Sequence, residues 1–311
     1  MSVDVIIPTY KPDEKLITII EKLLKQTVKP GKIILMNTEQ KYLENLLRGR
    51  KYDDLAKYLE IHHISNLEFD HGNTRNVGAS YSEADYLLFM TQDAIPEGNN
   101  LIEKMLSAYR DEFVCSCYAR QVADEDATLA ETFSRLFNYP EKSSVKSAED
   151  KNRLGIKTYF CSNACAMYRR DLFNKLGQFP TDMIFNEDMV FAHKVIEGGY
   201  KIAYEASAVV VHSHNYTNMQ QFHRNFDIGV SQAMHPEVFE DISSEAEGGS
   251  YVKKALQYFN EKGKYFYFIP FGFACVYRLL GFKLGKKYMK LPRKIVLKCT
   301  MSPIYFKKHW S

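Results

Sequence analysis

The feature that most constrains this chain is a repeated alternation of short apolar runs and amphipathic segments within its first ninety residues. Four runs have the length and composition of buried strands: residues 3–8, 32–36, 59–64 and 86–90. After the first run, Asp13 is placed to cap a helix, and apolar residues recur at helical spacing over 16–24. Strands that alternate with helices in this way predict an α/β fold, with a mostly parallel sheet and helices on both faces.

Polar clusters follow three of the predicted strands, at residues 8–11, 37–39 and 91–93. Sheets of this kind bind ligands beyond the carboxyl ends of their strands, so we expect the clusters to form one composite site. Asp93 follows the most uniformly apolar strand, which should be central. Mg²⁺ and Mn²⁺ prefer oxygen ligands and are commonly held by one or two carboxylates together with substrate phosphates. Asp93 is therefore a candidate metal ligand, although a turn residue would have the same position.

The second half of the chain offers two further polar clusters. Asn186, Glu187 and Asp188 precede a predicted helix that begins at Met189. An apolar strand at 208–211 ends at His212 and His214, whose spacing puts both side chains on the same face. Between the two halves, residues 71–75 and 143–152 are predicted loops, and 159–168 a strand.

Four motifs in order carry a resemblance to a known family. They are Ile-Ile-Pro-Thr-Tyr-Lys-Pro at 6–12, Gly-Asn-Thr-Arg-Asn-Val-Gly at 72–78, Thr-Gln-Asp-Ala at 91–94 and Asn-Glu-Asp at 186–188. Together they resemble the family 2 glycosyltransferases, which are inverting, nucleotide-sugar-dependent enzymes with the Rossmann-like GT-A fold. The resemblance covers roughly residues 3–235. Within the family, the motif at 91–94 and the stretches at 212–216 and 224–230 look most like bacterial rhamnosyltransferases, which use dTDP-L-rhamnose to build cell-surface polysaccharide.

The resemblance implies a set of residues that bind the nucleotide-sugar donor: Pro8, Thr9, Tyr10, Asn37, Thr38, Arg75, Gln92, Asp93, Ala94 and Asn163. Asn37 occupies the place of an Asp that reads the nucleobase in the family; an amide could pair with uracil or thymine, and an ordinary polar loop is the alternative. Arg75 suits a diphosphate by bidentate hydrogen bonding, and a structural Arg–carboxylate pair is the alternative. Asn163 could equally be a satisfied residue of a buried strand.

The resemblance also implies a metal site and a catalytic base. Asp93 would be the retained carboxylate of the family's Asp-x-Asp motif, and His212 or His214 would complete a site for Mn²⁺ or Mg²⁺. Asp188 would be the general base and Glu187 its backup, since inverting transfer needs one carboxylate to take the acceptor proton. The alternative for Asp188 is a helix N-cap. Two residues, Gln221 and Arg224, echo a weak Gln-x-x-Arg motif for diphosphate or acceptor contact.

The C-terminal region has a strong charge bias. From Lys253 to the end the sequence carries 14 Lys and Arg residues against one acidic residue, whereas the first 252 residues carry 27 basic and 37 acidic residues. Residues 264–288 are aromatic and apolar but interrupted by Pro270 and Arg278, so we expect this segment not to span a membrane. Its composition fits a helical segment that lies in the interface of an anionic membrane. A helical pair docked on the catalytic domain or forming a homodimer is the alternative, and a nucleic-acid surface is less favoured.

The sequence therefore predicts a GT-A domain at 1–240, with a nucleotide-binding half (1–95) and an acceptor half (96–240). A linker at 241–250 and a basic, aromatic, helical, membrane-associating region at 251–311 follow. The sequence begins directly on a strand-like run, so we expect no export and a cytoplasmic, peripheral location at the inner face of the cell membrane. The expected activity is metal-dependent, inverting transfer of L-rhamnose from dTDP-L-rhamnose to a polyprenyl-linked saccharide. Alternatives are transfer of another, UDP-linked sugar and a non-catalytic nucleotide-sugar-binding or scaffold protein.

Overall fold

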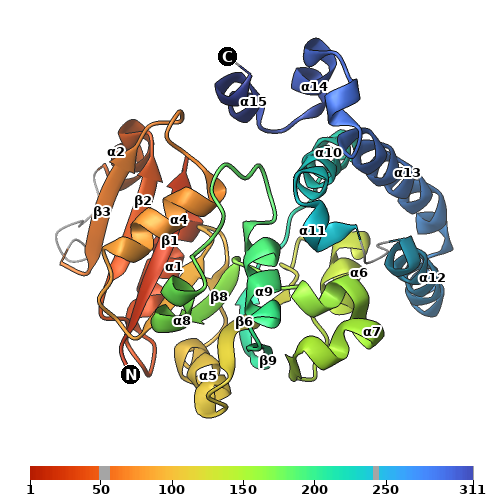
Figure 1. Cartoon of the computed structure of the whole chain (residues 1–311). Coiled ribbons are helices and arrows are strands. Elements are labelled where there is room, and N and C mark those ends of the chain that lie inside the picture. Colours follow the sequence, from red (N-terminus) through yellow and green to blue (C-terminus); the bar gives the residue numbers. More distant parts are fainter. Residues whose placement is uncertain (49–56, 241–244, 311) are drawn as a thin grey trace.

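The computed structural model describes residues 1–48, 57–240 and 245–310 (Figure 1). Within these ranges nine strands form one sheet: β1 (Val3–Tyr10), β2 (Ile33–Thr38), β3 (Leu59–Ile64), β4 (Tyr86–Met90), β5 (Ile95–Pro96), β6 (Val114–Val122), β7 (Ser144–Lys146), β8 (Cys165–Arg169) and β9 (Lys201–Val211). The strand order is β3-β2-β1-β4-β8-β6-β9-β5, and β7 pairs with β9. Strands β3, β2, β1 and β4 are parallel, while β8 is antiparallel to both β4 and β6. The predicted α/β fold is confirmed, with a mixed sheet in its second half.

Helices cover both faces of the sheet (Figure 1). The α-helices are α1 (Glu14–Leu24), α2 (Gln40–Leu47), α4 (His71–Ser80), α5 (Leu101–Ser107), α6 (Leu129–Asn138), α7 (Lys151–Leu154), α8 (Arg170–Lys175), α9 (Glu187–Glu197), α10 (Asn218–Met234), α11 (Pro236–Phe239), α12 (Glu245–Glu261), α13 (Phe268–Gly285), α14 (Arg293–Cys299) and α15 (Pro303–His309). Alternating side chains of β1 divide the core: Val5 and Ile7 pack with α1 and α5, while Ile6 packs with α4 and α9.

Three local predictions differ from the structure. Residues 71–75 are helical rather than a loop, because the Asp70 side chain caps α4 by accepting a hydrogen bond from the Asn73 backbone N–H at 2.6 Å. Residues 143–152 contain the short strand β7, which pairs with β9. In the predicted strand at 159–168, only residues from Cys165 onward pair with neighbours, since 155–159 form a 3₁₀ helix.

The linker predicted at 241–250 also differs. Residues 241–244 lie outside the described residues, and 245–250 form the first turns of α12. That helix is held by an apolar contact with α6, in which Phe133 packs against Ala255 and Phe259. Burial of that face against α6 favours helix over an extended linker. The division of the chain into domains otherwise stays a prediction.

The helix α13 packs closely along α10 (Figure 1). A Cβ atom added at Gly281 would overlap the Phe222 carbonyl oxygen, and one at Gly285 would overlap that of Phe226. Only glycine permits this approach of the two backbones.

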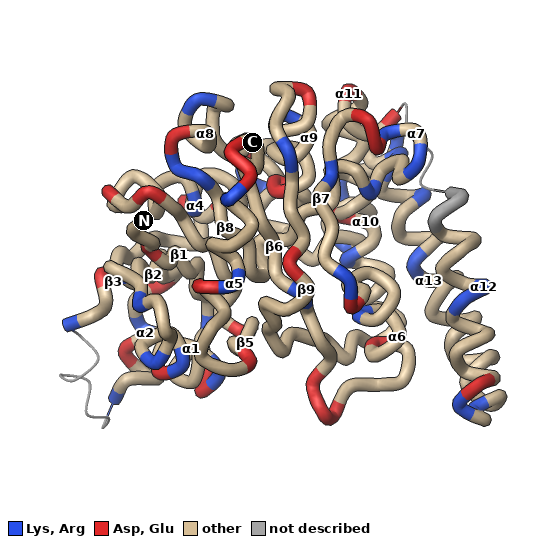
Figure 2. Tube along the Cα trace, turned by 90° about the horizontal axis from the view of Figure 1, so that it is seen from below, with Lys and Arg blue, Asp and Glu red and all other residues tan. Residues whose placement is uncertain are grey.

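Pro270 and Arg278, which interrupt the apolar run, both lie within the continuous helix α13. Proline is tolerated in the first turn of α13, where its missing N–H has no intrahelical partner. By length and composition alone, Tyr265–Gly285 could cross a membrane. Figure 2 shows that α13 is largely uncharged apart from basic positions, whereas charges of both signs are spread over the sheet.

Candidate active site

A cavity of about 570 Å³ opens at the carboxyl ends of β4 and β9. Arg75, Asp93 and Asp188, which are far apart in the sequence, all line it. The other predicted site residues on its wall are Asn163, Glu187, His212, His214, Gln221 and Arg224. The fold therefore brings the predicted metal ligands, catalytic carboxylates and α10 residues to one place.

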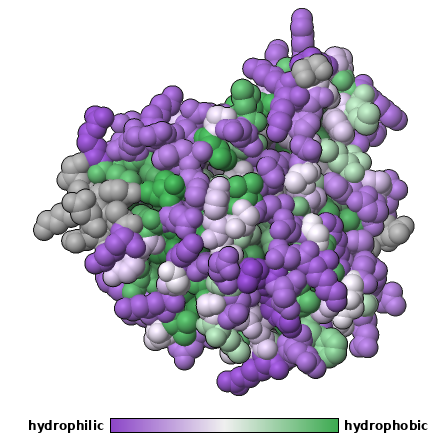
Figure 3. All heavy atoms as spheres, turned by 60° about the vertical axis from the view of Figure 1, so that its left-hand side comes forward, coloured by the Kyte–Doolittle hydropathy of each residue, from purple (hydrophilic) through white to green (hydrophobic). Residues whose placement is uncertain are grey.

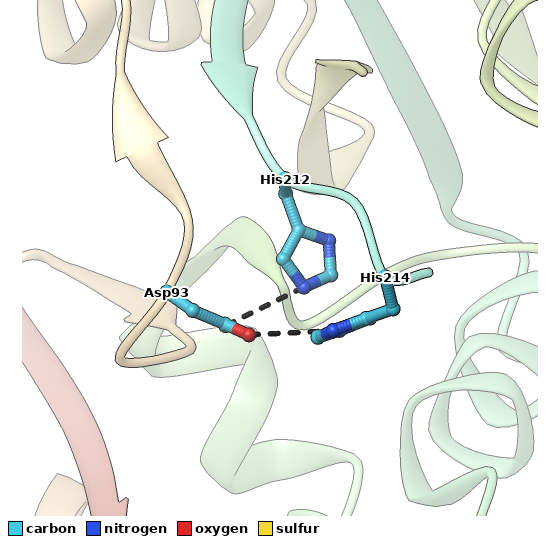
Figure 4. Close-up of side chains that lie close together, drawn as sticks. All are labelled: Asp93, His212 and His214. Atoms are coloured by element: carbon cyan, nitrogen blue, oxygen red, sulfur yellow. Dashed lines mark ion pairs between the residues drawn. The ribbon is translucent and has the colours of Figure 1, made fainter. Parts of the chain in front are cut away.

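Asp93, His212 and His214 form a compact cluster (Figure 4). Asp93 comes from the loop after β4, and both histidines follow β9. Their potential ligand atoms all lie within 4.8 Å of one another, with His212 Nε2 at 3.4 Å and His214 Nε2 at 3.5 Å from the Asp93 carboxylate. Both histidines, rather than one, are therefore within reach of a shared ion.

Neighbouring side chains orient His212 for metal binding. Its Nδ1 lies 2.8 Å from Gln121 Oε1, which also accepts a hydrogen bond from Arg135 Nη1 at 2.7 Å. Because Arg135 fixes this amide oxygen as an acceptor, His212 Nδ1 donates to it, and Nε2 is the ring nitrogen that faces Asp93 and would bind an ion. A hydrogen bond of this kind is typical of metal-ligating histidines.

The protonation states of the cluster also suit a cation. Burial acts to raise the pKa of Asp93, but the hydrogen bond from His212 and the charges of both histidines hold it well below its usual value. Burial, followed by the charge of His212, lowers the pKa of His214 to about 4. At neutral pH Asp93 is thus an ionised carboxylate and His214 a neutral imidazole, which are the forms that bind metals. A carboxylate with two imidazoles is a donor set that accommodates a divalent transition ion.

Asn163 positions the two carboxylates of the Asn-Glu-Asp motif. Its backbone N–H donates to Asp188 Oδ2 at 3.1 Å, and its side-chain Nδ2 donates to Glu187 Oε1 at 3.2 Å. The same Glu187 oxygen lies 3.2 Å from Arg75 Nη1, and both side chains are buried. Asn163 and Glu187 therefore bond to other groups of the protein. Arg75 forms the structural Arg–carboxylate pair that was the alternative to diphosphate binding, through its Nη1 atom. The Nε–H of Arg75 is buried without a hydrogen-bond partner among the described residues.

The environment separates the two carboxylates chemically. Burial, followed by the negative charge of Glu187, raises the pKa of Asp188 to about 7. Burial also acts to raise the pKa of Glu187, but the charges of Arg75 and His71 and the hydrogen bond from Asn163 together lower that pKa. Glu187 is thus an ionised partner of Arg75, whereas Asp188 is a carboxyl group that exchanges a proton near neutral pH. The N-cap of α9 is Asn186, not Asp188.

Tyr10 and Thr38 line a second cavity of about 410 Å³ at the ends of β1 and β2. The other predicted donor-binding residues of this region do not line either cavity. Asn37 is fully buried; its Oδ1 accepts a hydrogen bond from Thr9 Oγ1 at 3.0 Å, and its Nδ2 lies 2.9 Å from His63 Nδ1. Its amide is satisfied inside the protein, so a contact between Asn37 and a nucleobase has no support in the structure.

Three more residues predicted to contact the donor line neither cavity. Gln92 joins the ends of β4 and β1, because its amide makes two 2.9 Å hydrogen bonds with the backbone N–H and C=O of Tyr10. Ala94 belongs to the hydrophobic core and is fully buried. Pro8 lies within β1, away from both cavities.

Two arginines of the C-terminal half line the first cavity: Arg278, which the sequence analysis missed, and Arg224, which it predicted. Arg278 of α13 lines the first cavity, and its Nε donates to Gln221 Oε1 at 3.1 Å. The guanidinium of Arg224 lies 4.6 Å from the centre of the Phe185 ring. The available signal for Arg278 was its place inside an apolar run, since a charge among apolar residues needs a partner within the protein.

The sequence profile described as glycosyl transferase family 2 matches residues 4–177. The chain belongs to this family, and it is therefore a glycosyltransferase. The predicted family is confirmed.

Two curated relatives are similar over most of the chain. The O-antigen chain rhamnosyltransferase RfbN of Salmonella typhimurium is 36% identical over 314 residues, covering 100% of this chain and 96% of the relative. The O-antigen chain rhamnosyltransferase WbaN of Salmonella anatum is 41% identical over 251 residues, covering 80% of this chain and 78% of the relative.

Solved structures share the fold at low sequence identity. The mannosyltransferase PcManGT from Pyrobaculum calidifontis, in complex with GDP-Man and Mn²⁺, matches with a TM-score of 0.57 and 12% identity, over 99% of this chain and 86% of that one. Residues 1–349 of S. aureus TarS, in complex with UDP-GlcNAc, match with a TM-score of 0.51 and 14% identity, over 93% and 92% of the two chains. These matches support the GT-A-like fold.

Proposed function

We propose that this chain is an inverting, metal-dependent rhamnosyltransferase. It moves L-rhamnose from dTDP-L-rhamnose to a hydroxyl group of a polyprenyl-linked saccharide during cell-surface polysaccharide synthesis. The observation that carries the chemistry is that the Asp93–His212–His214 cluster and Asp188, with its raised pKa, line one cavity. The choice of sugar rests on the similarity to two O-antigen chain rhamnosyltransferases.

Each group in the cavity has a defined task in this reaction. The acceptor oxygen bonds to the anomeric carbon as the bond from that carbon to the dTDP oxygen breaks, and Asp188 takes the proton of the acceptor hydroxyl. Asp93, His212 and His214 would hold Mn²⁺ or Mg²⁺, which when bound neutralises charge on the leaving diphosphate. The free Nε–H of Arg75 and the guanidinium of Arg224 are donors of the kind that binds phosphate oxygens. No protein acid is needed, because dTDP leaves as an anion.

A donor screen tests this proposal directly. With Mn²⁺ present and no acceptor, the enzyme should slowly hydrolyse its donor. The rate of dTDP release from dTDP-L-rhamnose should be at least tenfold higher than the rate of UDP release from UDP-glucose or UDP-GlcNAc. The measurement is chromatography of the released nucleoside diphosphate. Preference for a UDP-sugar would replace the donor assignment. Binding of a nucleotide sugar without any release, even with lipid-linked saccharide added, would contradict catalysis and leave a nucleotide-sugar-binding protein.

The outer face of α13 supports a location at the membrane surface. Five apolar side chains follow one another at helical spacing and are 51–72% exposed: Phe266, in the 3₁₀ turn just before α13, and Ile269, Phe273, Val276 and Leu280 within the helix. The opposite face holds the glycines that pack on α10. Basic residues alone supply the charge after Glu261. An exposed apolar stripe flanked by lysines suits the interface of an anionic bilayer, which is where a polyprenyl-linked acceptor lies. We place the enzyme on the cytoplasmic face of the cell membrane.

Vesicle binding tests this placement. Replacing Phe266, Ile269 and Phe273 together with serine should weaken co-sedimentation with phosphatidylglycerol vesicles by more than about tenfold, since each exposed apolar side chain gains roughly 1 kcal/mol or more on burial. The matched control replaces three exposed apolar residues elsewhere with serine: Phe113, Leu136 and Val145. Equal binding by both triple variants would rule out α13 as the membrane contact. Point substitutions are preferable to truncation before Lys264, which would strip the packing partner from α10.

A further inference from the structure

The second cavity is closed on one side by the C-terminal segment 300–309, which we call the C-terminal wall. Tyr10 and Thr38, at the ends of β1 and β2, form one side of this cavity, and Ile304, Tyr305 and Lys308 belong to the other. In Figure 1, α15 lies at the same end of the molecule as the carboxyl ends of β1 and β2. Figure 3 shows the C-terminal part standing above the body of the molecule, with apolar side chains where the two meet.

A buried carboxylate fastens the C-terminal wall. Asp227 of α10 is 3% exposed and accepts hydrogen bonds from Thr300 Oγ1 at 2.6 Å and from the Met301 backbone N–H at 2.9 Å. Phe306 is 1% exposed and packs in a small core that includes Phe226 of α10. The wall is thus joined to α10, the helix that also carries Gln221 and Arg224 into the first cavity.

A second set of contacts joins the wall to the loop before α9. The Tyr305 hydroxyl donates to the Asp182 carbonyl oxygen at 2.8 Å, and Ile184 packs in the same core as Phe306. The wall is therefore held from two sides, by α10 and by the loop that leads to the Asn-Glu-Asp motif.

The two cavities adjoin at His71, which lines both. The first holds the cluster suited to a cation and a diphosphate. The second lies at the ends of two parallel strands, offers an exposed aromatic ring at Tyr10 and a second ring at Tyr305, and at about 410 Å³ falls within the usual range for small-ligand pockets. Aromatic faces and polar edges are what a nucleoside requires.

We propose that the C-terminal wall completes the nucleoside subsite of the donor, with Ile304, Tyr305 and Lys308 on the side opposite Tyr10 and Thr38. This inference rests on the proposed function and extends it to a segment that follows the region matched by the family profile. The wall acts on donor affinity through the nucleoside alone, so its residues leave binding of the diphosphate and metal unchanged.

Matched neighbours in the same region give a sharp test. Lys308→Glu and Ile304→Asp change residues that line the cavity, whereas Lys307→Glu and Ile295→Asp make the same charge changes at exposed positions that do not line it. Calorimetry of the full chain with Mn²⁺ measures binding of dTDP and, separately, of inorganic pyrophosphate. Lys308→Glu and Ile304→Asp should each weaken dTDP binding at least tenfold and pyrophosphate binding less than twofold. The two control variants should match the wild type.

The outcomes separate this inference from the proposed function. If all four variants bind dTDP as the wild type does, the C-terminal wall has no part in the nucleoside subsite, while the proposed function stands. If the two lining variants lose pyrophosphate and dTDP binding equally, the wall contacts the diphosphate and the inference is overturned. If the wild-type protein with Mn²⁺ binds every nucleoside diphosphate no more tightly than it binds pyrophosphate, both the inference and the proposed function are overturned.

Discussion

Asp188→Asn should lower the turnover number by about 10³, within the range that a positioned general base contributes, while the dissociation constant of dTDP changes less than threefold. Asparagine keeps the size of the side chain and can still accept a hydrogen bond from the Asn163 or Met189 backbone N–H. It cannot take a proton from the acceptor hydroxyl. Steady-state rates with a lipid-linked acceptor and calorimetric titration of dTDP provide the two measurements.

The pH dependence gives an independent reading of the same group. Burial and Glu187 raise the pKa of Asp188 to about 7, so in the wild type the turnover number should fall as pH decreases through that value and level off above it. Asp126→Asn, which changes an exposed aspartate, should leave both the rate and the profile unchanged. A rate that does not vary between pH 6 and 8, or a large loss of dTDP affinity in Asp188→Asn, would show that Asp188 is not the base.

Removing any member of the Asp93–His212–His214 cluster should abolish the effect of Mn²⁺ on nucleotide binding. In the wild type, we expect Mn²⁺ to tighten dTDP binding by roughly 10- to 100-fold, because Asp93, His212 and His214 would hold a cation that neutralises charge on the diphosphate. In Asp93→Asn, His212→Ala and His214→Ala, dTDP should bind with the same weak affinity with and without Mn²⁺. Calorimetry with and without EDTA gives the comparison, and electron paramagnetic resonance counts bound Mn²⁺ directly.

The control for the metal variants is His235→Gln, which changes a histidine paired with Glu237 outside the cavity. It should retain the full Mn²⁺ response. If His214→Ala retains it as well, the ion is held by Asp93 and His212 alone. If all three cluster variants respond to Mn²⁺ like the wild type, the metal binds elsewhere and the cluster has another role.

The first half of the fold could be predicted because its signals are local. Apolar runs of strand length, separated by helices, defined β1, β2, β3 and β4, and the parallel arrangement follows from that alternation. Asp93 and the two histidines were predictable because each follows an apolar strand at the same edge of the sheet. Their mutual distance was not, since it depends on β6 and β9 pairing in parallel beside β8.

Other features depended on contacts that sequence periodicity does not encode. Gln92 follows β4 as predicted, whereas Asn37 lies within β2, and their amides are used by the Tyr10 backbone and by Thr9. The start of α4 depended on an aspartate cap one residue before a glycine-containing segment. The return of residues 300–309 to the ends of β1 and β2 is a long-range contact, fixed by Asp227 rather than by any local pattern.

The glycine contact between α10 and α13 fixes the distance between these two helices beside the first cavity. Gly281 and Gly285 bring the two backbones together within a turn or two of Arg278, whose guanidinium bonds to Gln221 across that seam. A methyl group at either glycine would force the two helices apart and move Arg278 away from Gln221. If α13 lies on the bilayer as we propose, its close contact with α10 would hold the cavity at a fixed distance from the lipid surface.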